Sequence, residues 1–275
     1  MLTVYKHDHV ICAEGGLEKN GKVVRTIFSF IVDGMVVDTG PKNLEKELIP
    51  FYEKNTVDQV VLTHSHEDHS GNCPWFAEEK GLPIYAHSNG LDICAQDTPY
   101  PKYRQMTWGK RAAFKALPLS HTIESINDSW EVIYTPGHAD DHVSLYSKER
   151  GMMFSGDLYV NPQTRIAMNS ESIPSIIHSL KKLLKYDFDS MFCAHSGYHA
   201  HGKKQIQHKI DYLEQLYKEV ANLYITGNTV IEIREKLFPK RYGMIQLSDG
   251  EWDTLHIVSS IVADIEKRNL HFKNK

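Results

Sequence analysis

The segment Thr63-His64-Ser65-His66-Glu67-Asp68-His69-Ser70-Gly71-Asn72 is the most informative stretch of this chain. It directly follows the apolar run 59–63 (QVVLT), which has the length and composition of a buried β-strand. A tight turn at the end of a strand can aim alternate side chains into one pocket. Those of His64 and His66 can therefore converge, while Asp68 and the histidine after it reach a nearby point. Four potential ligands in six residues predict two metal ions side by side.

Further residues of metal-ligand type follow other apolar segments, at the points where strands are expected to end. His138, Asp157 and His195 each stand within two residues of a glycine, which lets the backbone approach a site closely. Two bridged ions need such ligands from distant strands. Asp38 ends another apolar segment, and its carboxylate could accept a hydrogen bond from a ligand imidazole and so fix the tautomer of that ring.

The order of the expected elements indicates a mixed fold of the α+β class. Residues 3–37 are rich in β-forming side chains, and Asp33-Gly34 between two such runs is typical of a hairpin turn. Asn43 is predicted to cap a helix, and helices then alternate with short apolar strands, including a helix over 173–186. Two mixed sheets with helices on the outside account for this order.

Two parts of the chain depart from the alternation. Residues 96–108 contain prolines and aromatic side chains without clear periodicity, and they predict a loop that could roof a site. Beyond residue 202 the pattern is helical, with helices expected over 203–224, 228–237 and 254–268. We therefore expect a main domain over 1–202 and a C-terminal helical extension over 203–275 that packs on it. The sequence does not assign a role to the extension.

The composition excludes several classes of protein. The chain has 275 residues and a net charge of −4, which argues against a nucleic-acid partner. Its apolar runs are far shorter than the roughly 20 residues of a membrane-spanning helix, and residues 1–10 do not resemble a secretory leader. We expect a cytoplasmic protein with four free cysteines, no membrane partner and a small-molecule substrate, and we leave a homodimer open. The 16 histidines again point to a metal.

Taken together, the motifs resemble those of the metallo-β-lactamase superfamily of hydrolases. The five ordered motifs of that family match Asp38, the segment 64–69, His138, Asp157 and His195. The resemblance covers roughly residues 3–210 and implies a four-layer αββα sandwich with its site at one edge. It also implies that Asp157 bridges two metal ions. One ion would be held by His64, His66 and His138, and the other by Asp68, His69 and His195.

The resemblance further implies a dinuclear hydrolase of a small carbonyl substrate, a lactone or a thioester. Asp68 and Asp157 match the dinuclear hydrolases, namely the lactonases, glyoxalase II and related thioesterases, and some nucleases, whereas true β-lactamases typically place other residues there. A hydroxide that bridges the ions is the expected nucleophile, and Asp68 could pass a proton to the leaving group. Tyr159 and Tyr198 could donate to a developing oxyanion. The histidine-rich ligand set favours zinc, and iron or manganese stays open.

The resemblance leaves the substrate open. Ile166 and Met168 stand where glyoxalase II has a lysine and a tyrosine that grip glutathione, and Tyr159 lies two residues after Asp157 rather than three as in acyl-homoserine lactonases. A phosphodiesterase or ribonuclease of the same superfamily is the alternative, because small nucleases with a helical C-terminal extension resemble this arrangement. We expect His142 beside the ligands or at the surface, not as a ligand itself.

Overall fold

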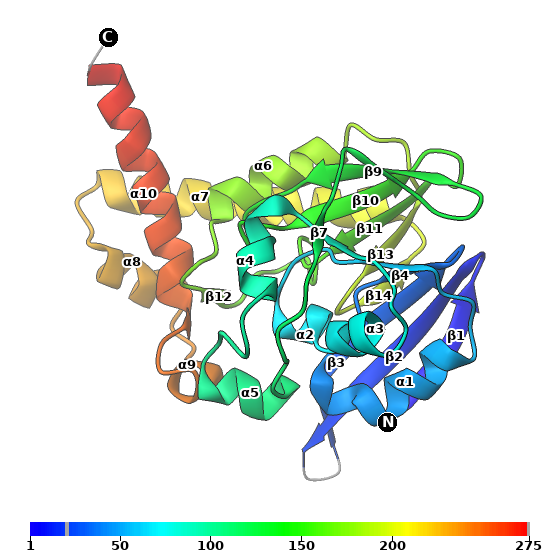
Figure 1. Cartoon of the computed structure of the whole chain (residues 1–275). Coiled ribbons are helices and arrows are strands. Elements are labelled where there is room, and N and C mark those ends of the chain that lie inside the picture. The colour runs from blue at the N-terminus through cyan, green and yellow to red at the C-terminus, as the bar shows by residue number, and fades with distance from the viewer. Residues whose placement is uncertain (20–21, 274–275) are drawn as a thin grey trace.

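The computed structural model describes residues 1–19 and 22–273 (Figure 1). Two β-sheets pack face to face, with helices on both outer faces, and the predicted αββα sandwich is thereby confirmed. In the part of the chain that the structure describes, no helix is both long and apolar enough to cross a membrane.

The first sheet contains seven strands in the order of the sequence. They are β1 (Leu2–His7), β2 (Val10–Lys19), β3 (Lys22–Val32), β4 (Met35–Val37), β5 (Gln59–Val61), β6 (Ile84–Ala86) and β7 (Leu117–Pro118). The strands from β1 to β4 are antiparallel, and those from β4 to β7 are parallel. The predicted hairpin at Asp33-Gly34 joins β3 to β4, and both turn residues have a positive φ, which aspartate and glycine tolerate best.

The second sheet contains six strands in the order β14-β13-β11-β10-β9-β8. Their bounds are β8 (Thr122–Glu124), β9 (Ser129–Tyr134), β10 (Val143–Ser147), β11 (Met152–Gly156), β13 (Ser190–Cys193) and β14 (Gly197–His199). The register between β11 and β13 shifts between Phe154 and Gly156. Gly156 adopts a φ of 49°, and this irregularity turns the chain at the end of β11, where Asp157 follows.

The facing sides of the sheets share one apolar core. Aromatic side chains from both sheets fill it, and the ring centroids of Phe30 and Phe192 lie 5.6 Å apart. On the outer face of the first sheet pack α1 (Glu45–Glu53) and α3 (Cys73–Glu78). The outer face of the second sheet is covered by α6 (Ile173–Leu183) and α7 (Gly202–Ile225).

The remaining helices are mostly short. They are the 3-10 helices η1 (Lys42–Leu44) and η2 (Ser88–Gly90), and the α-helices α2 (Glu67–Ser70), α4 (Leu91–Cys94), α5 (Lys102–Trp108), α8 (Val230–Leu237), α9 (Gly243–Leu247) and α10 (Thr254–Lys273). Two features differ from the sequence predictions. The expected loop over 96–108 contains α5. Asn43 does not cap a helix, because it lies inside η1, between the N-cap positions Pro41 and Leu44, and its side-chain amide donates to the carbonyl groups of Met106 and Thr107 near the end of α5.

The C-terminal extension is tied to the sandwich in two ways. Helices α7, α8 and α10 share one apolar core with α6 (Figure 1). In addition, β15 (Trp252–Asp253) pairs with β12 (Ala167–Met168), which lies in the segment after Asp157. The extension thus reaches the same edge of the sandwich as the predicted site.

Candidate metal centre

The ends of several strands bring the predicted ligands to one edge of the sandwich. Asp38 directly follows β4, Asp157 follows β11 and His195 lies just beyond β13. His138 lies in the turn after β9, and the histidine-rich segment follows β5 and forms α2. Because the core side of each strand is filled by apolar residues, the polar side chains that follow the strands gather in the space at this edge. All seven predicted ligand residues lie there in three overlapping clusters.

One cluster consists of His64, His66 and His138. Nδ1 of His66 lies 2.9 Å from Nε2 of His64 and 3.2 Å from Nε2 of His138. Three imidazole nitrogens at such separations face one common point. This is the donor set that a tetrahedral zinc site with one open position uses.

The second set contains Asp68, His69 and His195. Oδ2 of Asp68 lies 3.4 Å from Nε2 of His195 and 3.8 Å from Nε2 of His69. Asp157 lies between the two sets, because its Oδ2 is 3.0 Å from Nε2 of His195 and 3.5 Å from the Nε2 atoms of both His69 and His138.

Two buried atoms of this centre are left without a hydrogen-bond partner. They are Nε2 of His69 and Oδ1 of Asp157. A buried polar atom without a partner costs free energy, and such atoms in a native fold call for an explanation. Nε2 of His69 faces the carboxylates of Asp68 and Asp157, and Oδ1 is the second oxygen of the Asp157 carboxylate that lies between the two sets. Both are atoms of metal-ligand type, so a bound cation would satisfy them. The residues present therefore fit the metal ions that the sequence predicts.

The other ring nitrogen of four of these histidines has a partner of its own. Nδ1 of His69 lies 2.8 Å from Asp38, and Nδ1 of His138 lies 2.5 Å from Glu171. Nδ1 of His195 lies 2.8 Å from the backbone oxygen of Thr26. Nδ1 of His64 lies 3.1 Å from Oγ1 of Thr63, which is itself bound to Asp38. These contacts fix the ring orientations and direct Nε2 of each ring into the centre.

The electrostatics of the centre also favour a cation. Burial, and then the neighbouring histidines, hold the pKa of His64 well below its ordinary value. Burial would also lower the pKa of His69, but the carboxylates of Asp157, Asp38 and Asp68 raise it well above its ordinary value. Burial would raise the pKa of Asp157, but His195 and His69 hold it well below its usual range. The carboxylate of Asp157 is thus ionised in a buried space, which attracts positive charge.

A family model described as the metallo-beta-lactamase superfamily matches residues 25–195. The chain belongs to this superfamily. The probable metallo-hydrolase YqjP of Bacillus subtilis is 23% identical over 91% of this chain and 94% of its own length. A hydroxyacylglutathione hydrolase of Idiomarina loihiensis is 26% identical over 58% of this chain and 55% of its own length. The prediction of a metal-dependent hydrolase of the metallo-β-lactamase superfamily is confirmed at this level.

Solved structures of metallo-β-lactamase proteins have the same fold. A metallo-beta-lactamase family protein from Thermus thermophilus aligns with a TM-score of 0.67 at 19% identity, over 90% of this chain and 91% of that one. A beta-lactamase domain protein from Burkholderia ambifaria aligns with a TM-score of 0.68 at 14% identity, over 92% of this chain and 87% of that one. At these identities the likeness concerns the fold alone.

A cavity of about 940 Å³ opens beside the candidate metal centre. Its polar end includes ligand residues of both sets, and much of its wall is apolar. Much of the wall comes from α5, the segment 160–168 and the C-terminal extension, which are distant in the sequence, and β3 and the start of α6 add further lining residues. Among the lining residues are Tyr103, Arg104, Trp108, Ile166, Met168, Lys209, Met244, Leu247 and Trp252. The segment 96–108, expected to roof a site, contributes to this wall through α5.

The two tyrosines proposed as oxyanion donors are not brought to the centre. The hydroxyl of Tyr159 donates to Gln205 on α7, and its ring is buried in the core beneath the helices. The ring of Tyr198 stacks on His7, and its hydroxyl lies 3.5 Å from Ser190. Neither residue lines the cavity. The ring of Tyr159 fills a core position, and the partly buried ring of Tyr198 packs against the core between the sheets, so packing directs both hydroxyls away from the centre.

Several residues near the centre were not singled out from the sequence. Glu171, which holds His138, lies just before α6 and has no motif spacing that would reveal it. Arg104 and Lys209 line the cavity from helices outside the family motifs. His142 was expected either beside the candidate ligands or at the surface, and it lies beside them. Its Nε2 accepts the backbone N–H of Asp157 at 3.0 Å.

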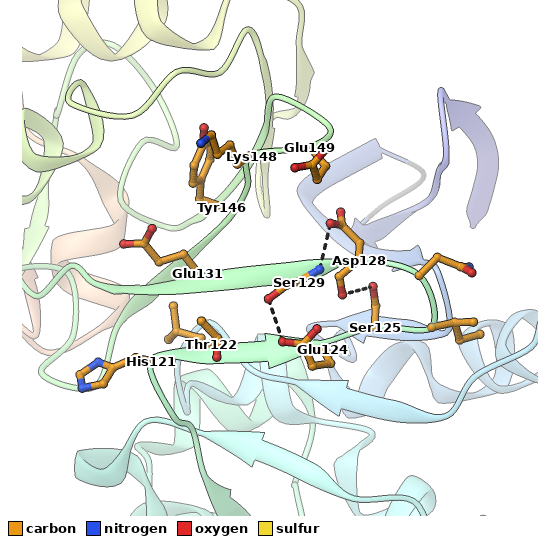
Figure 2. Close-up of a pocket in the computed structure, with 13 residues that line it drawn as sticks. His121, Thr122, Glu124, Ser125, Asp128, Ser129, Glu131, Tyr146, Lys148 and Glu149 are labelled. Atoms are coloured by element: carbon orange, nitrogen blue, oxygen red, sulfur yellow. Dashed lines mark hydrogen bonds between the residues drawn. The ribbon is translucent and has the colours of Figure 1, made fainter.

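A second cavity, of about 970 Å³, lies around the start of β9, at the other end of this strand from the turn that contains His138 (Figure 2). Figure 2 shows acidic side chains around it, where Ser129 donates to Glu124. In the described residues, the clusters of metal-ligand type all lie at the first centre. The second cavity is therefore not a candidate metal site.

Proposed function

We propose that the chain is a dinuclear metal-dependent hydrolase that cleaves a small carbonyl substrate, a lactone or a thioester. The observation that carries this proposal is the position of Asp157. Its Oδ2 lies within 3.5 Å of His138 in one donor set and of His69 and His195 in the other. One carboxylate between two donor sets is the arrangement that two bridged ions need.

The donor sets suit zinc best, and iron or manganese is compatible with them. His64, His66 and His138 would hold one ion, and Asp68, His69 and His195 the other. When bound, the two ions supply a water of lowered pKa and a positive charge that polarises a carbonyl group.

Among the residues of the chain, Asp68 is the best placed to move a proton. Its carboxylate is buried and lines the cavity, so it can reach a bound substrate. Burial would raise the pKa of Asp68, but His69 and His195 hold it below its ordinary value. The carboxylate is therefore ionised at neutral pH. It can accept a proton and hand it to the leaving alkoxide or thiolate.

The walls of the cavity support a substrate with an apolar part. Ile166, Met168 and Trp252 line it on the side of the C-terminal extension. A thioester is supported by the hydroxyacylglutathione hydrolases among the relatives. Glutathione itself is disfavoured as the thiol, because Ile166 and Met168 cannot offer it the polar contacts that a lysine and a tyrosine would make. A lactone with an apolar substituent fits the same walls.

The experiment is pH-stat hydrolysis by zinc-loaded protein of a lactone and a thioester with the same acyl chain, with a phosphodiester as a third substrate. Chelator-treated protein is the blank. Metal-dependent cleavage of either carbonyl substrate supports the proposal, and the faster one identifies the leaving group. Cleavage of the phosphodiester alone would overturn it in favour of the alternative function.

A matched pair of variants tests the role of Asp157. Asp157→Ala should lose at least one ion per chain by elemental analysis and nearly all turnover. The control is Asp187→Ala, because the side chain of Asp187 is fully exposed and outside the cavity. Full activity and two ions in Asp157→Ala would contradict the bridging role.

A further inference from the structure

Arg104 on α5 joins three segments that are far apart in the sequence. Its Nε and Nη2 atoms donate to the two carboxylate oxygens of Glu67 at 2.6 and 2.7 Å. Its Nη1 donates to Oε1 of Glu251 at 3.1 Å and lies 3.8 Å from Sδ of Met168. The guanidinium therefore contacts the metal-binding turn, the C-terminal extension and the segment after Asp157 at once.

The contact with Glu67 bears on the metal-binding turn, because Glu67 stands between His66 and Asp68. Glu67 is only 2% exposed. A buried carboxylate beside Asp68 would be strongly unfavourable without a partner. The two parallel hydrogen bonds from Arg104 neutralise it and fix its direction, which a single hydrogen bond would not do. Since Glu67 and Asp68 belong to the same turn of α2, this pair constrains the backbone that presents the ligands.

The contact with Glu251 bears on the cavity wall. Glu251 directly precedes β15, whose Trp252 pairs with Met168 of β12. Met168 and Trp252 both line the cavity, and so does Leu247 at the end of α9. Figure 1 shows α5 beside α9 at this edge of the molecule. Arg104 is thus the point where the wall formed by the extension is attached to the turn that presents the ligands.

We propose that Arg104 is a positioning residue with two separable tasks. Through Glu67 it holds the metal-binding turn in place, and through Glu251 it holds the wall of the extension over the cavity. The inference rests on the proposed function, since the cavity is treated as the substrate site. It assigns the extension a role in substrate binding, and it connects that role to the ligand geometry through one side chain.

Two single variants separate the tasks. Glu251→Gln removes the charge at the wall and should raise the KM about fivefold or more, with kcat and zinc affinity within about twofold of the parent protein. Glu67→Gln weakens the contact with the metal turn and should lower zinc affinity about tenfold or more. Arg104→Met should show both effects. Arg104→Lys keeps the charge but not the paired hydrogen bonds, so it should recover only part of the loss.

The control is Arg268→Met. Arg268 forms a surface pair with Asp264 on α10, away from the cavity, and this variant should match the parent protein in every measurement. The double variant Glu67→Gln/Arg104→Met adds a further check. Because Glu67 and Arg104 act as a unit, the double variant should lose no more zinc affinity than Arg104→Met alone.

Two measurements do not depend on turnover. Zinc affinity is obtained by competition with a chromophoric chelator, and hydrogen exchange follows the backbone of residues 243–253. Faster exchange in Glu251→Gln and Arg104→Met, but not in Arg268→Met, is the expected result. The inference would be overturned if both Arg104 variants had the hydrogen-exchange rates and the zinc affinity of the parent protein, with an unchanged KM wherever a substrate is cleaved. If no substrate is cleaved, the proposed function fails, while these two measurements still decide the role of Arg104.

Discussion

Oδ2 of Asp38 lies 2.8 Å from Nδ1 of His69, and both side chains are buried. The same carboxylate accepts hydrogen bonds from the backbone N–H and the hydroxyl of Thr63, at 2.8 and 2.7 Å. Asp38 therefore connects the ends of β4 and β5 with the helical turn that carries His69. An acid at this point holds the ring of His69 with Nε2 facing the centre.

Asp38→Asn should lower zinc affinity by about 10- to 100-fold while the protein still folds. An amide cannot accept hydrogen bonds from Thr63 and His69 through both of its terminal atoms, and it carries no charge. Asparagine tolerates the positive φ of 57° at this position, so the backbone is retained. Competition with a chelator measures the affinity. Asp33→Asn is the control, since Asp33 also has a positive φ and lies in a turn distant from the centre. Equal affinity in Asp38→Asn and the parent protein would show that Asp38 does not support a ligand.

Glu171→Gln should lower zinc affinity about tenfold, because the hydrogen bond from Nδ1 of His138 would no longer be made to a charged acceptor. Circular dichroism should be unchanged. Glu131→Gln, at an exposed position on the second sheet, is the matched control. An unchanged zinc affinity in Glu171→Gln would mean that this carboxylate serves only to accept the backbone N–H of Met168.

Gly71→Ala should destabilise the metal-free protein by about 2 to 3 kcal/mol. An added Cβ would lie 2.3 Å from the backbone nitrogen of Lys42 and 2.6 Å from Pro41, which are backbone contacts that cannot yield without moving the turn after α2. Urea unfolding measures the change. Gly243→Ala is the control, because nothing lies within 4 Å of its added Cβ. Equal stabilities of the two variants would contradict the tight contact at Gly71.

In the parent protein, Lys209 should make the free energy of unfolding rise between about pH 8 and pH 10.5, and Lys209→Met should remove this rise. Burial lowers the pKa of Lys209 from 10.5 to about 8. Within that window the unfolded chain binds a proton that the folded protein has released, so the free energy of unfolding increases with pH. Below pH 8 the lysine is charged in both states and the slope vanishes. The shift corresponds to a difference on the order of 3 kcal/mol across the window.

The test compares the two proteins at each pH, which cancels the other groups that titrate there. The advantage of Lys209→Met over the parent protein should be largest at pH 7 and shrink by pH 10.5. A pH-independent difference would show that Lys209 is not buried in its charged form at pH 7.

The sequence predicted that the seven candidate ligand residues converge at one edge, and the structure brings them together, because each of them stands in a short segment that follows an apolar strand. The Asp33-Gly34 hairpin was likewise predictable, since its turn type depends on two adjacent residues. The helix α5 was not, because residues 96–108 lack a periodic apolar face. That helix is tied to the rest of the protein by Asn43 and by the pair of Arg104 with Glu67, which are contacts between distant segments.

The expectation for Asn43 failed for a similar reason. Its residue type suits an N-cap, but a 3-10 turn precedes α1 and places Asn43 inside η1, where its amide group donates to the carbonyl groups near the end of α5. The tyrosines after Asp157 and His195 show the same limit. Proximity in sequence to a candidate ligand does not decide which face of the chain a ring occupies. The ring of Tyr159 fills a core position, and that of Tyr198 packs against the core.

What the sequence alone determined was the chemistry of the donor groups and the fold class, because these depend on local pattern and on motifs in a fixed order. The tertiary structure decided which atom of each donor faces the centre, since that depends on partners such as Glu171 and the backbone oxygen of Thr26. It also decided that the C-terminal extension forms part of the cavity wall. That placement results from the pairing of β12 with β15 and from packing against α6, and no local pattern encodes it.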